Sequence, residues 1–213
     1  MSDLLTKLSV TQIQRGIVRS LGGSRVEAVP NVSWGFFREK GIECDLLVLS
    51  GANNLHEYEI KRSWGDFLAD FKKTNFHNDL RLKKLTFVLP LCLAGEKLKK
   101  WCADNYQTFK RTFDFWFYDE YAQMYRPNLF PVGSKYTTEY YLTEEMLWYI
   151  NMHDPLNGLR RSLFLEERYQ LCRLACIRLW SNPPAEALPN IPSEEYEPWR
   201  KRGNGDALPR LVK

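Results

Sequence analysis

The sequence has no long apolar run and none of the cysteine spacings that form structural frameworks. None of its 213 residues lies in a stretch approaching the roughly 18 apolar residues of a membrane-spanning helix, so we expect no membrane partner. The five cysteines are odd in number and lack a CxxC spacing, which favours core thiols in a reducing compartment. Residues 1–7 lack the apolar segment of a signal peptide, so we expect a cytoplasmic protein.

The motifs of several enzyme classes are also missing. There is no Walker-type loop, GxGxxG or GxSxG, which argues against NTPases, dinucleotide-dependent enzymes and serine hydrolases. The chain does have 44% hydrophobic and 14% aromatic residues. This composition is enough for one globular domain with an extension.

Helical and extended patterns alternate along the first half of the chain. Apolar spacing predicts helices at 11–21, 63–73 and 95–105, with Thr11 and Ser63 as caps. Extended segments are predicted at 25–30, 32–37, 43–50, 55–61, 85–91 and 113–118. The order predicts an α/β fold with a mixed central β-sheet flanked by helices, in which an antiparallel meander supplies one half and crossovers the other.

Composition divides the chain into three parts. Residues 1–118 form the expected α/β core. Residues 119–180 are an aromatic-rich helical extension that we expect to pack on the core, with helices at 143–151 and 159–179. From residue 181 the chain holds six prolines and few apolar residues, so 181–213 is expected to be an extended or disordered tail.

Two short strands with charged ends are the most informative feature. Alternation places Glu57, Glu59 and Lys61 on one face of their strand. Asp45 lies fourteen residues before Glu59, on the preceding strand. If these strands pair, two carboxylates and an amine converge, a set that can hold a divalent metal and activate a water. Charged residues at strand ends are also common in proteins where they have no catalytic function. The surroundings of the motif therefore decide between a catalytic and a purely structural role.

Positive charge is concentrated after this motif. The net charge is +4, yet residues 61–111 hold twelve Lys and Arg against five acids, a local charge of +7. A basic surface beside an acidic site suggests a polyanionic substrate, whereas ordinary solvated helix faces are the alternative. The candidate nucleic-acid-binding residues are Arg62, Lys72, Lys73, His77, Arg81, Lys83 and Lys84. His77 could contact phosphate from a basic loop, and the alternative is a surface or capping role.

Residues 11 to about 118 resemble the PD-(D/E)XK nuclease superfamily. The resemblance rests on the order of elements, on Asp45 followed by Glu59-Ile60-Lys61, and on Arg62-Ser63-Trp64 leading into a helix. Residues 81–90 are similar to the family's next strand and its basic lead-in. The most similar members are small bacterial and phage proteins linked to DNA repair.

This resemblance implies a restriction-endonuclease-like core and a role for each motif residue. Asp45 and Glu59 would be metal ligands, and the carbonyl of Ile60 would add a third. Lys61 would orient or help deprotonate the attacking water and offset phosphate charge. Such oxygen ligands suit Mg²⁺, with Mn²⁺ as a substitute.

The chain departs from the family at its leading helix. Many members place a glutamate there, but this helix offers Gln12 and Gln14 and no acid. A glutamine can accept a hydrogen bond but contributes no charge, which points to a single metal. Gln14, Glu43 and Glu57 are therefore the candidate accessory residues.

Three possible functions follow from the sequence. The first is a metal-dependent nuclease that hydrolyses DNA phosphodiester bonds. The second is a catalytically inactive module of the same fold that binds DNA or a protein partner, and an enzyme acting on small molecules is a third. The sequence leaves single-stranded, duplex and branched DNA open as substrates, and duplex cutting by this fold would imply a homodimer.

Overall fold

The structure is a computed structural model that describes residues 7–21, 27–32, 44–72, 77–119, 129–130 and 138–181. Glu43, Lys73 and most of the predicted tail lie outside these residues. The chain divides into two compact units, Met1–Ala175 and Cys176–Lys213. No helix in the described part is long and apolar enough to cross a membrane.

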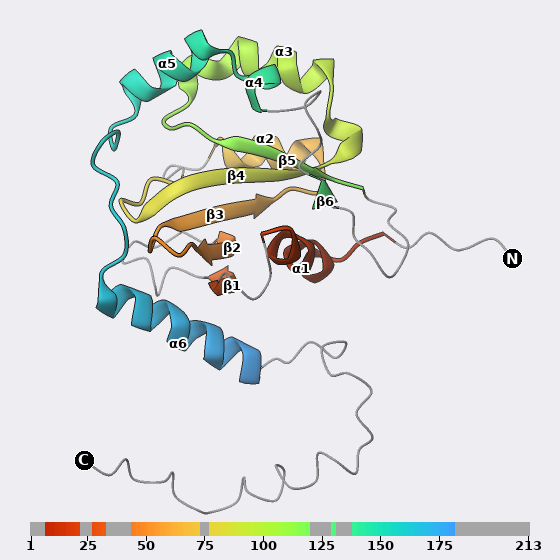
Figure 1. Ribbon diagram of the computed structural model, residues 1–213. Coiled ribbons are helices and arrows are strands. Elements are labelled where there is room, and N and C mark those ends of the chain that lie inside the picture. Colours follow the sequence, from red (N-terminus) through yellow and green to blue (C-terminus); the bar gives the residue numbers. More distant parts are fainter. Residues whose placement is uncertain are drawn as a thin grey trace, which may run out of the picture. The chain divides into compact units, whose positions relative to one another are not determined.

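A six-stranded mixed sheet, with its strands in sequence order, organises the first unit (Figure 1). The strands are β1 (Glu27–Val32), β2 (Cys44–Leu49), β3 (Leu55–Ile60), β4 (Leu82–Pro90), β5 (Asp114–Tyr118) and β6 (Leu129–Phe130). The first three strands form an antiparallel meander. Crossovers then make β3, β4 and β5 parallel, and β6 pairs antiparallel with β5. The predicted α/β class with a mixed sheet is confirmed.

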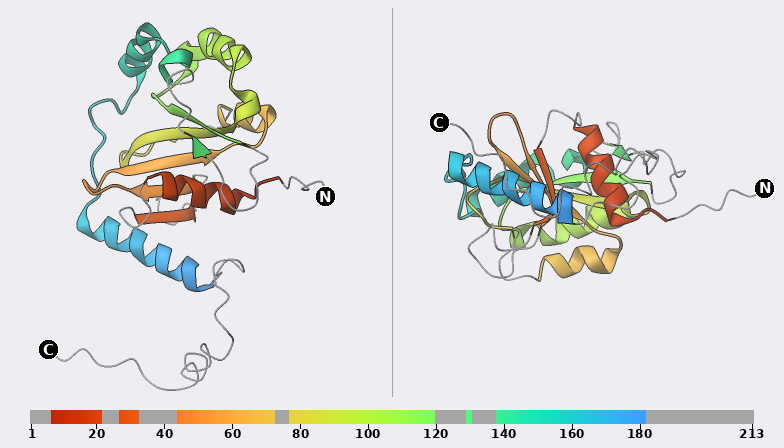
Figure 2. Two further views of the ribbon diagram at one scale, coloured as in Figure 1. Left: turned by 45° about the vertical axis from the view of Figure 1, so that its right-hand side comes forward. Right: turned by 90° about the horizontal axis from the view of Figure 1, so that it is seen from below.

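Helices cover both faces of this sheet. They are α1 (Val10–Ser20), α2 (Trp64–Asp70), α3 (Glu96–Asn105), α4 (Thr138–Tyr141), α5 (Glu144–His153) and α6 (Leu165–Ser181), with short 3₁₀ turns at Leu91–Leu93 and Tyr106–Thr108. Figure 2 shows α1 and α2 on opposite sides of the strands. Ile17 of α1 shares a buried cluster with Val88, whereas Phe67 of α2 shares one with Phe87. Successive side chains of β4 therefore point to opposite faces of the sheet and belong to two separate core layers.

Of the two predicted helix caps, Ser63 is confirmed and Thr11 is wrong. The Ser63 hydroxyl accepts a hydrogen bond from the Asp66 N–H at 3.1 Å, and Thr143 caps α5. The first helix begins earlier than expected, because Ser9 caps it and forms a capping box with Gln12. Thr11 lies inside α1. A side-chain oxygen that satisfies free N–H groups fixes where each helix starts.

The separation of the predicted extended segments 25–30 and 32–37 is wrong. β1 runs through both residues, and its register with β2 is kept from Glu27 to Val32. Pro30 is tolerated because β1 is an edge strand, where one missing N–H donor is of little consequence. Asn31 adopts a left-handed backbone with φ of 50°, and Val29 and Val32 join the same buried cluster despite their odd spacing.

An aromatic core anchors α2 over the sheet. Phe67 is fully buried, and its ring centroid lies 5.4 Å from that of Phe87 and 4.8 Å from that of Trp101. Tyr141 and Ile150 belong to the same cluster, so α4 and α5 pack on this layer. The position of α2 relative to β3 and β4 therefore depends on Phe67.

We expect Phe67→Ala to lower the free energy of unfolding by about 3–5 kcal/mol, because the change leaves a large cavity in a packed core. Urea unfolding followed by circular dichroism measures the loss. Phe164→Ala is the matched control, since this ring is 60% exposed, and should change stability by less than about 1 kcal/mol. Equal losses for the two variants would contradict this view of the core.

Candidate functional site

The site lies where β2 and β3 separate. The paired ladder between these strands ends at Leu46 and Tyr58. Just beyond it, the Ile60 N–H donates to Asp45 Oδ2 at 2.8 Å, and the Asp45 N–H donates to Glu59 Oε1 at 3.3 Å. Carboxylates thus take the place of backbone acceptors at the end of the ladder. The structure brings Asp45 and Glu59 together, as the sequence predicts.

Lys61 follows directly on the same face. Its ammonium donates to Glu59 Oε2 at 2.8 Å and lies 3.1 Å from Asp70 Oδ2. Asp70 is the last residue of α2, and like Phe67 it is a buried residue of that helix. The Lys61 N–H also donates to the Val88 carbonyl at 3.0 Å, so the backbone beside the motif is tied to β4. The predicted clustering of Asp45, Glu59 and Lys61 therefore holds.

His77 links the two buried acids that remain. Its Nδ1 lies 2.9 Å from Glu57 Oε1, and its Nε2 lies 2.8 Å from Asp70 Oδ2. An ionised carboxylate can only accept hydrogen bonds, so both ring nitrogens donate and the ring is an imidazolium. His77 therefore fits neither the predicted phosphate contact from a basic loop nor the alternative surface or capping role, because it is buried and two acids and the neighbouring Phe87 ring enclose it.

These contacts form one ion-pair chain of five side chains: Glu57, His77, Asp70, Lys61 and Glu59. Its members are 0%, 4%, 1%, 4% and 2% exposed, in the same order. Buried charges are stable only when opposite charges and hydrogen bonds offset their lost hydration. The alternation of acid and base along the chain meets that requirement.

Negative charge nevertheless exceeds positive charge at the site. Burial and the nearby Glu57 raise the pKa of Glu59 to about 8, although His77 and Lys61 act in the opposite direction. Burial mainly raises the pKa of Asp45 as well. Glu57 differs: burial is again the largest single effect and would raise its pKa, but His77, the Cys44 thiol and Arg111 together hold that pKa below the usual value. Burial is thus the main reason why the two carboxylates nearest the strand ends have raised pKa values.

The same acids determine the pKa values of the two bases, Lys61 and His77. Burial alone would lower both pKa values, but Glu59 and Asp70 raise that of Lys61, and Glu57 and Asp70 raise that of His77 to about 10. Both side chains therefore carry their charge at neutral pH. Each side chain is a fixed cation in this conformation, and neither can accept a proton.

Within the part of the chain that the structure describes, two sets of side chains have the composition and spacing to hold a metal ion. One consists of Cys44, Glu57 and Glu59, and the other of Glu59, Asp70 and His77, with the potential ligand atoms of each within 4.8 Å of one another. Glu59 belongs to both sets. Among the described residues, Glu57 Oε2 is buried without a hydrogen-bond partner. An unpaired buried carboxylate oxygen is a natural cation ligand.

Gln14 supports the site from α1. It is buried, and its amide nitrogen donates to the Asp45 carbonyl at 2.7 Å and to Asn31 Oδ1 at 3.0 Å. These bonds hold β2 at the residue that carries the first carboxylate. Gln14 therefore positions the Asp45 backbone through its amide group. The other accessory candidates differ, since Glu57 is in the ion-pair chain and Glu43 lies outside the described residues.

The predicted basic residues do not gather at this site. Lys84 pairs with His56 in the parallel register and Glu59 pairs with Phe87, so the two positions are about 10 Å apart along the strands. Lys84 forms an ion pair with Asp114 at 2.7 Å, and Lys83 donates to the Arg160 carbonyl. The expectation that the basic segment forms one surface beside the acids is wrong for these two lysines.

The remaining basic candidates also lie in different surroundings. Arg81 is bound by Asp79 at 2.6 Å. Arg62 is exposed directly after the motif and donates to the Leu8 carbonyl, and Lys72 is exposed beyond α2. Lys73 lies outside the described residues. Arg62 is thus the exposed cation next to the motif in sequence.

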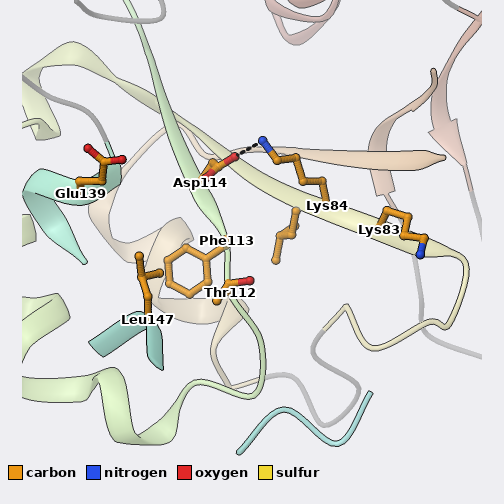
Figure 3. Close-up of a pocket in the computed structure, with 8 residues that line it drawn as sticks. Lys83, Lys84, Thr112, Phe113, Asp114, Glu139 and Leu147 are labelled. Carbon is orange, nitrogen blue, oxygen red and sulfur yellow. Dashed lines mark ion pairs between the residues drawn. The ribbon is translucent and has the colours of Figure 1, made fainter. Parts of the chain in front are cut away.

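A separate pocket of about 170 Å³ lies at the start of β4 and β5 (Figure 3). Lys83 and Lys84 line it, together with Asp114 and Glu139. Figure 3 shows the Lys84–Asp114 ion pair at its wall and Leu147 nearby. The balanced charges of this lining do not favour an anionic ligand, and the pocket contains no member of the ion-pair chain.

Sequence reasoning missed Asp70 as part of the site. The signal was its spacing of three from Phe67, which places both on one face of α2. An acid on the apolar face of a helix must find a buried partner. Cys44 was also missed, and its thiol donates to Glu57 Oε1. No pattern in the sequence predicts that contact.

We expect the charged state of His77 to make stability depend on pH. Its pKa is about 10 in the folded protein against an ordinary value of 6.5. The stabilising contribution is therefore complete below about pH 6.5 and is lost as the pH rises toward 10. Urea unfolding should show the wild-type free energy falling through this window, with a shallower fall in His77→Gln. His153→Gln, at an exposed position, should follow the wild type, and a His77→Gln curve parallel to the wild-type curve would contradict the assignment.

Comparisons with known proteins give no family for this chain. No family model matches it, and no curated protein matches it. A structural search finds similarity to the SPO1766 protein of unknown function from Silicibacter pomeroyi, with 15% sequence identity and a TM-score of 0.41. The match covers 86% of this chain and 98% of that protein.

Proposed function

We propose that this chain is a metal-dependent nuclease that hydrolyses DNA phosphodiester bonds. The observation that carries the proposal is the group of four carboxylates around Lys61 at the end of β3, of which Asp45 is half-buried and the other three are buried. Asp45, Glu57, Glu59 and Asp70 oppose one lysine and one histidine within the hydrogen-bonded set. A site that concentrates negative charge at a strand end, beside a fixed ammonium, suits a divalent cation and a phosphate.

The residues fit a divalent cation held by oxygen atoms. Glu59 would hold it together with Asp45, and the Ile60 carbonyl would be the third ligand. The raised pKa of Glu59 means that a proton partly offsets its charge, and a cation would replace that proton. Mg²⁺ is the expected ion and Mn²⁺ its substitute. When bound, the ion would lower the pKa of a water and offset charge developing on the phosphate.

The protein's own groups would then orient the reactants. Lys61 donates one N–H each to Glu59 and Asp70. Among the described residues, its third N–H is left for a water or a phosphate oxygen. The ammonium would stabilise negative charge that develops on the phosphate in the transition state. Gln14 would keep the Asp45 backbone in place during this step.

DNA is the proposed substrate because the site needs an anion that the nearby cations can guide. Arg62 is exposed immediately after Lys61, and Lys72 is exposed after α2. Both can contact backbone phosphates on either side of the reacting one, which positions nucleic acid without reading its sequence. Lys83 and Lys84 would contribute only to a longer bound strand.

The direct test is cleavage of single-stranded, duplex, branched and flap DNA with Mg²⁺ or Mn²⁺. We expect Asp45→Ala and Lys61→Ala each to lower the rate roughly 10²- to 10⁴-fold, because charge stabilisation at the phosphate is lost. Asp104→Ala and Lys100→Ala, at exposed positions of α3, should keep wild-type rates. Cleavage that survives in either site variant would overturn the assignment, and chelation should abolish wild-type activity.

A second candidate function is DNA binding without turnover. It is favoured by the absence of an acid on α1, where Gln14 donates its amide to the backbone. In this case DNA affinity should fall steeply with salt, should not change with Mg²⁺, and should weaken in Lys83→Ala/Lys84→Ala. Fluorescence anisotropy with labelled DNA measures all three effects. Metal-dependent cleavage by the wild type would exclude this function.

A further inference from the structure

We propose that Asp70 and His77 are positioning residues that hold the Lys61 ammonium against Glu59 for the proposed reaction. This inference rests on the proposed function and adds two residues to it. Asp70 comes from α2 and His77 from the connection between α2 and β4. Neither residue belongs to the motif that carries the first three site residues.

The first step of the argument is the shared oxygen of Asp70. Its Oδ2 lies 3.1 Å from Lys61 Nζ and 2.8 Å from His77 Nε2. One carboxylate oxygen therefore sets the distance between two cations. A lysine side chain has four rotatable methylene bonds and loses its position easily. Asp70 gives the ammonium a second fixed partner besides Glu59, which removes that freedom.

The second step is the way in which the protein fixes His77 itself. Its φ is 45°, a left-handed conformation that is unfavourable for a residue with a side chain. Arg111 donates to the His77 carbonyl at 2.5 Å and to the Leu82 carbonyl at 3.3 Å. Arg111 is itself buried. A buried arginine therefore holds the backbone of a strained histidine in place. Strained residues of this kind cluster at functional sites.

The third step is the return of the ion-pair chain to its starting strand. Glu57 and Glu59 lie two residues apart on the same face of β3. His77 binds the first and Lys61 the second, and Asp70 joins the two cations. The chain is thus anchored at both ends on one rigid strand. Such an arrangement fixes an ammonium more precisely than a single ion pair could.

Enzyme kinetics provide the first test. We expect Asp70→Asn to lower kcat about 10- to 100-fold with little change in KM, the usual cost of losing a supporting hydrogen bond around a reactive group. In a Lys61→Ala background the same change should cost less than about twofold, because the group that Asp70 positions is gone. Equal losses in both backgrounds would overturn the inference. Asp104→Asn serves as the matched control and should keep wild-type kinetics.

A second variant covers the case in which Asp70→Asn does not fold. His77→Gln keeps a donor toward Asp70 but removes the positive charge, and Arg111 can still bind the backbone carbonyl. We expect a kcat loss in the same direction that again disappears in the Lys61→Ala background. A loss that persists there would overturn the role of His77. His153→Gln is its control.

Amine labelling separates this inference from the proposed function. An acylating reagent followed by peptide mass spectrometry reports the reactivity of each lysine without any substrate. Lys61 should react far more slowly than Lys100 in the wild type, and Asp70→Asn should raise the Lys61 rate several-fold while leaving Lys100 unchanged. An inactive wild type would contradict the proposed function alone. An unchanged Lys61 rate would overturn the positioning role whether or not the protein cleaves DNA.

Discussion

The contact between Lys61 and Glu59 is the interaction on which the site depends. Two charges have been withdrawn from water at the end of a strand, and each would be costly alone. Asp70 and His77 extend this pair into a chain that crosses from β3 to α2 and back. The aromatic layer around Phe67 holds α2 where Asp70 can reach the ammonium. The packing of the core and the electrostatics of the site are therefore parts of one arrangement.

The same arrangement leaves the four carboxylates of the site unequally paired with positive charge. The bases satisfy Glu57 and Asp70 first, as the low pKa of Glu57 shows. The pKa values of Glu59 and Asp45 are raised, and both residues lie where β2 and β3 separate. In the proposed function, these are the two carboxylates that would share the cation.

Much of the fold follows from local patterns, and much of the site does not. Alternation was sufficient to place Glu57, Glu59 and Lys61 on one face, and Ser63 was sufficient to start α2, because both depend on neighbouring residues alone. Asp70 and His77 could not be paired with them from sequence, since that contact requires α2 to be docked over β3. The separation of Lys84 from Glu59 likewise depends on the parallel register of β3 and β4.

The edge strand β1 has a consequence for how copies of this protein can associate. A free edge normally offers a regular row of donors and acceptors to another strand. Here Pro30 lacks an N–H, and Asn31 next to it adopts a left-handed backbone. A strand added along β1 would meet this interruption at the fourth and fifth of its six residues. The described part of β1 is therefore poorly suited to continuing the sheet into a second copy of the chain.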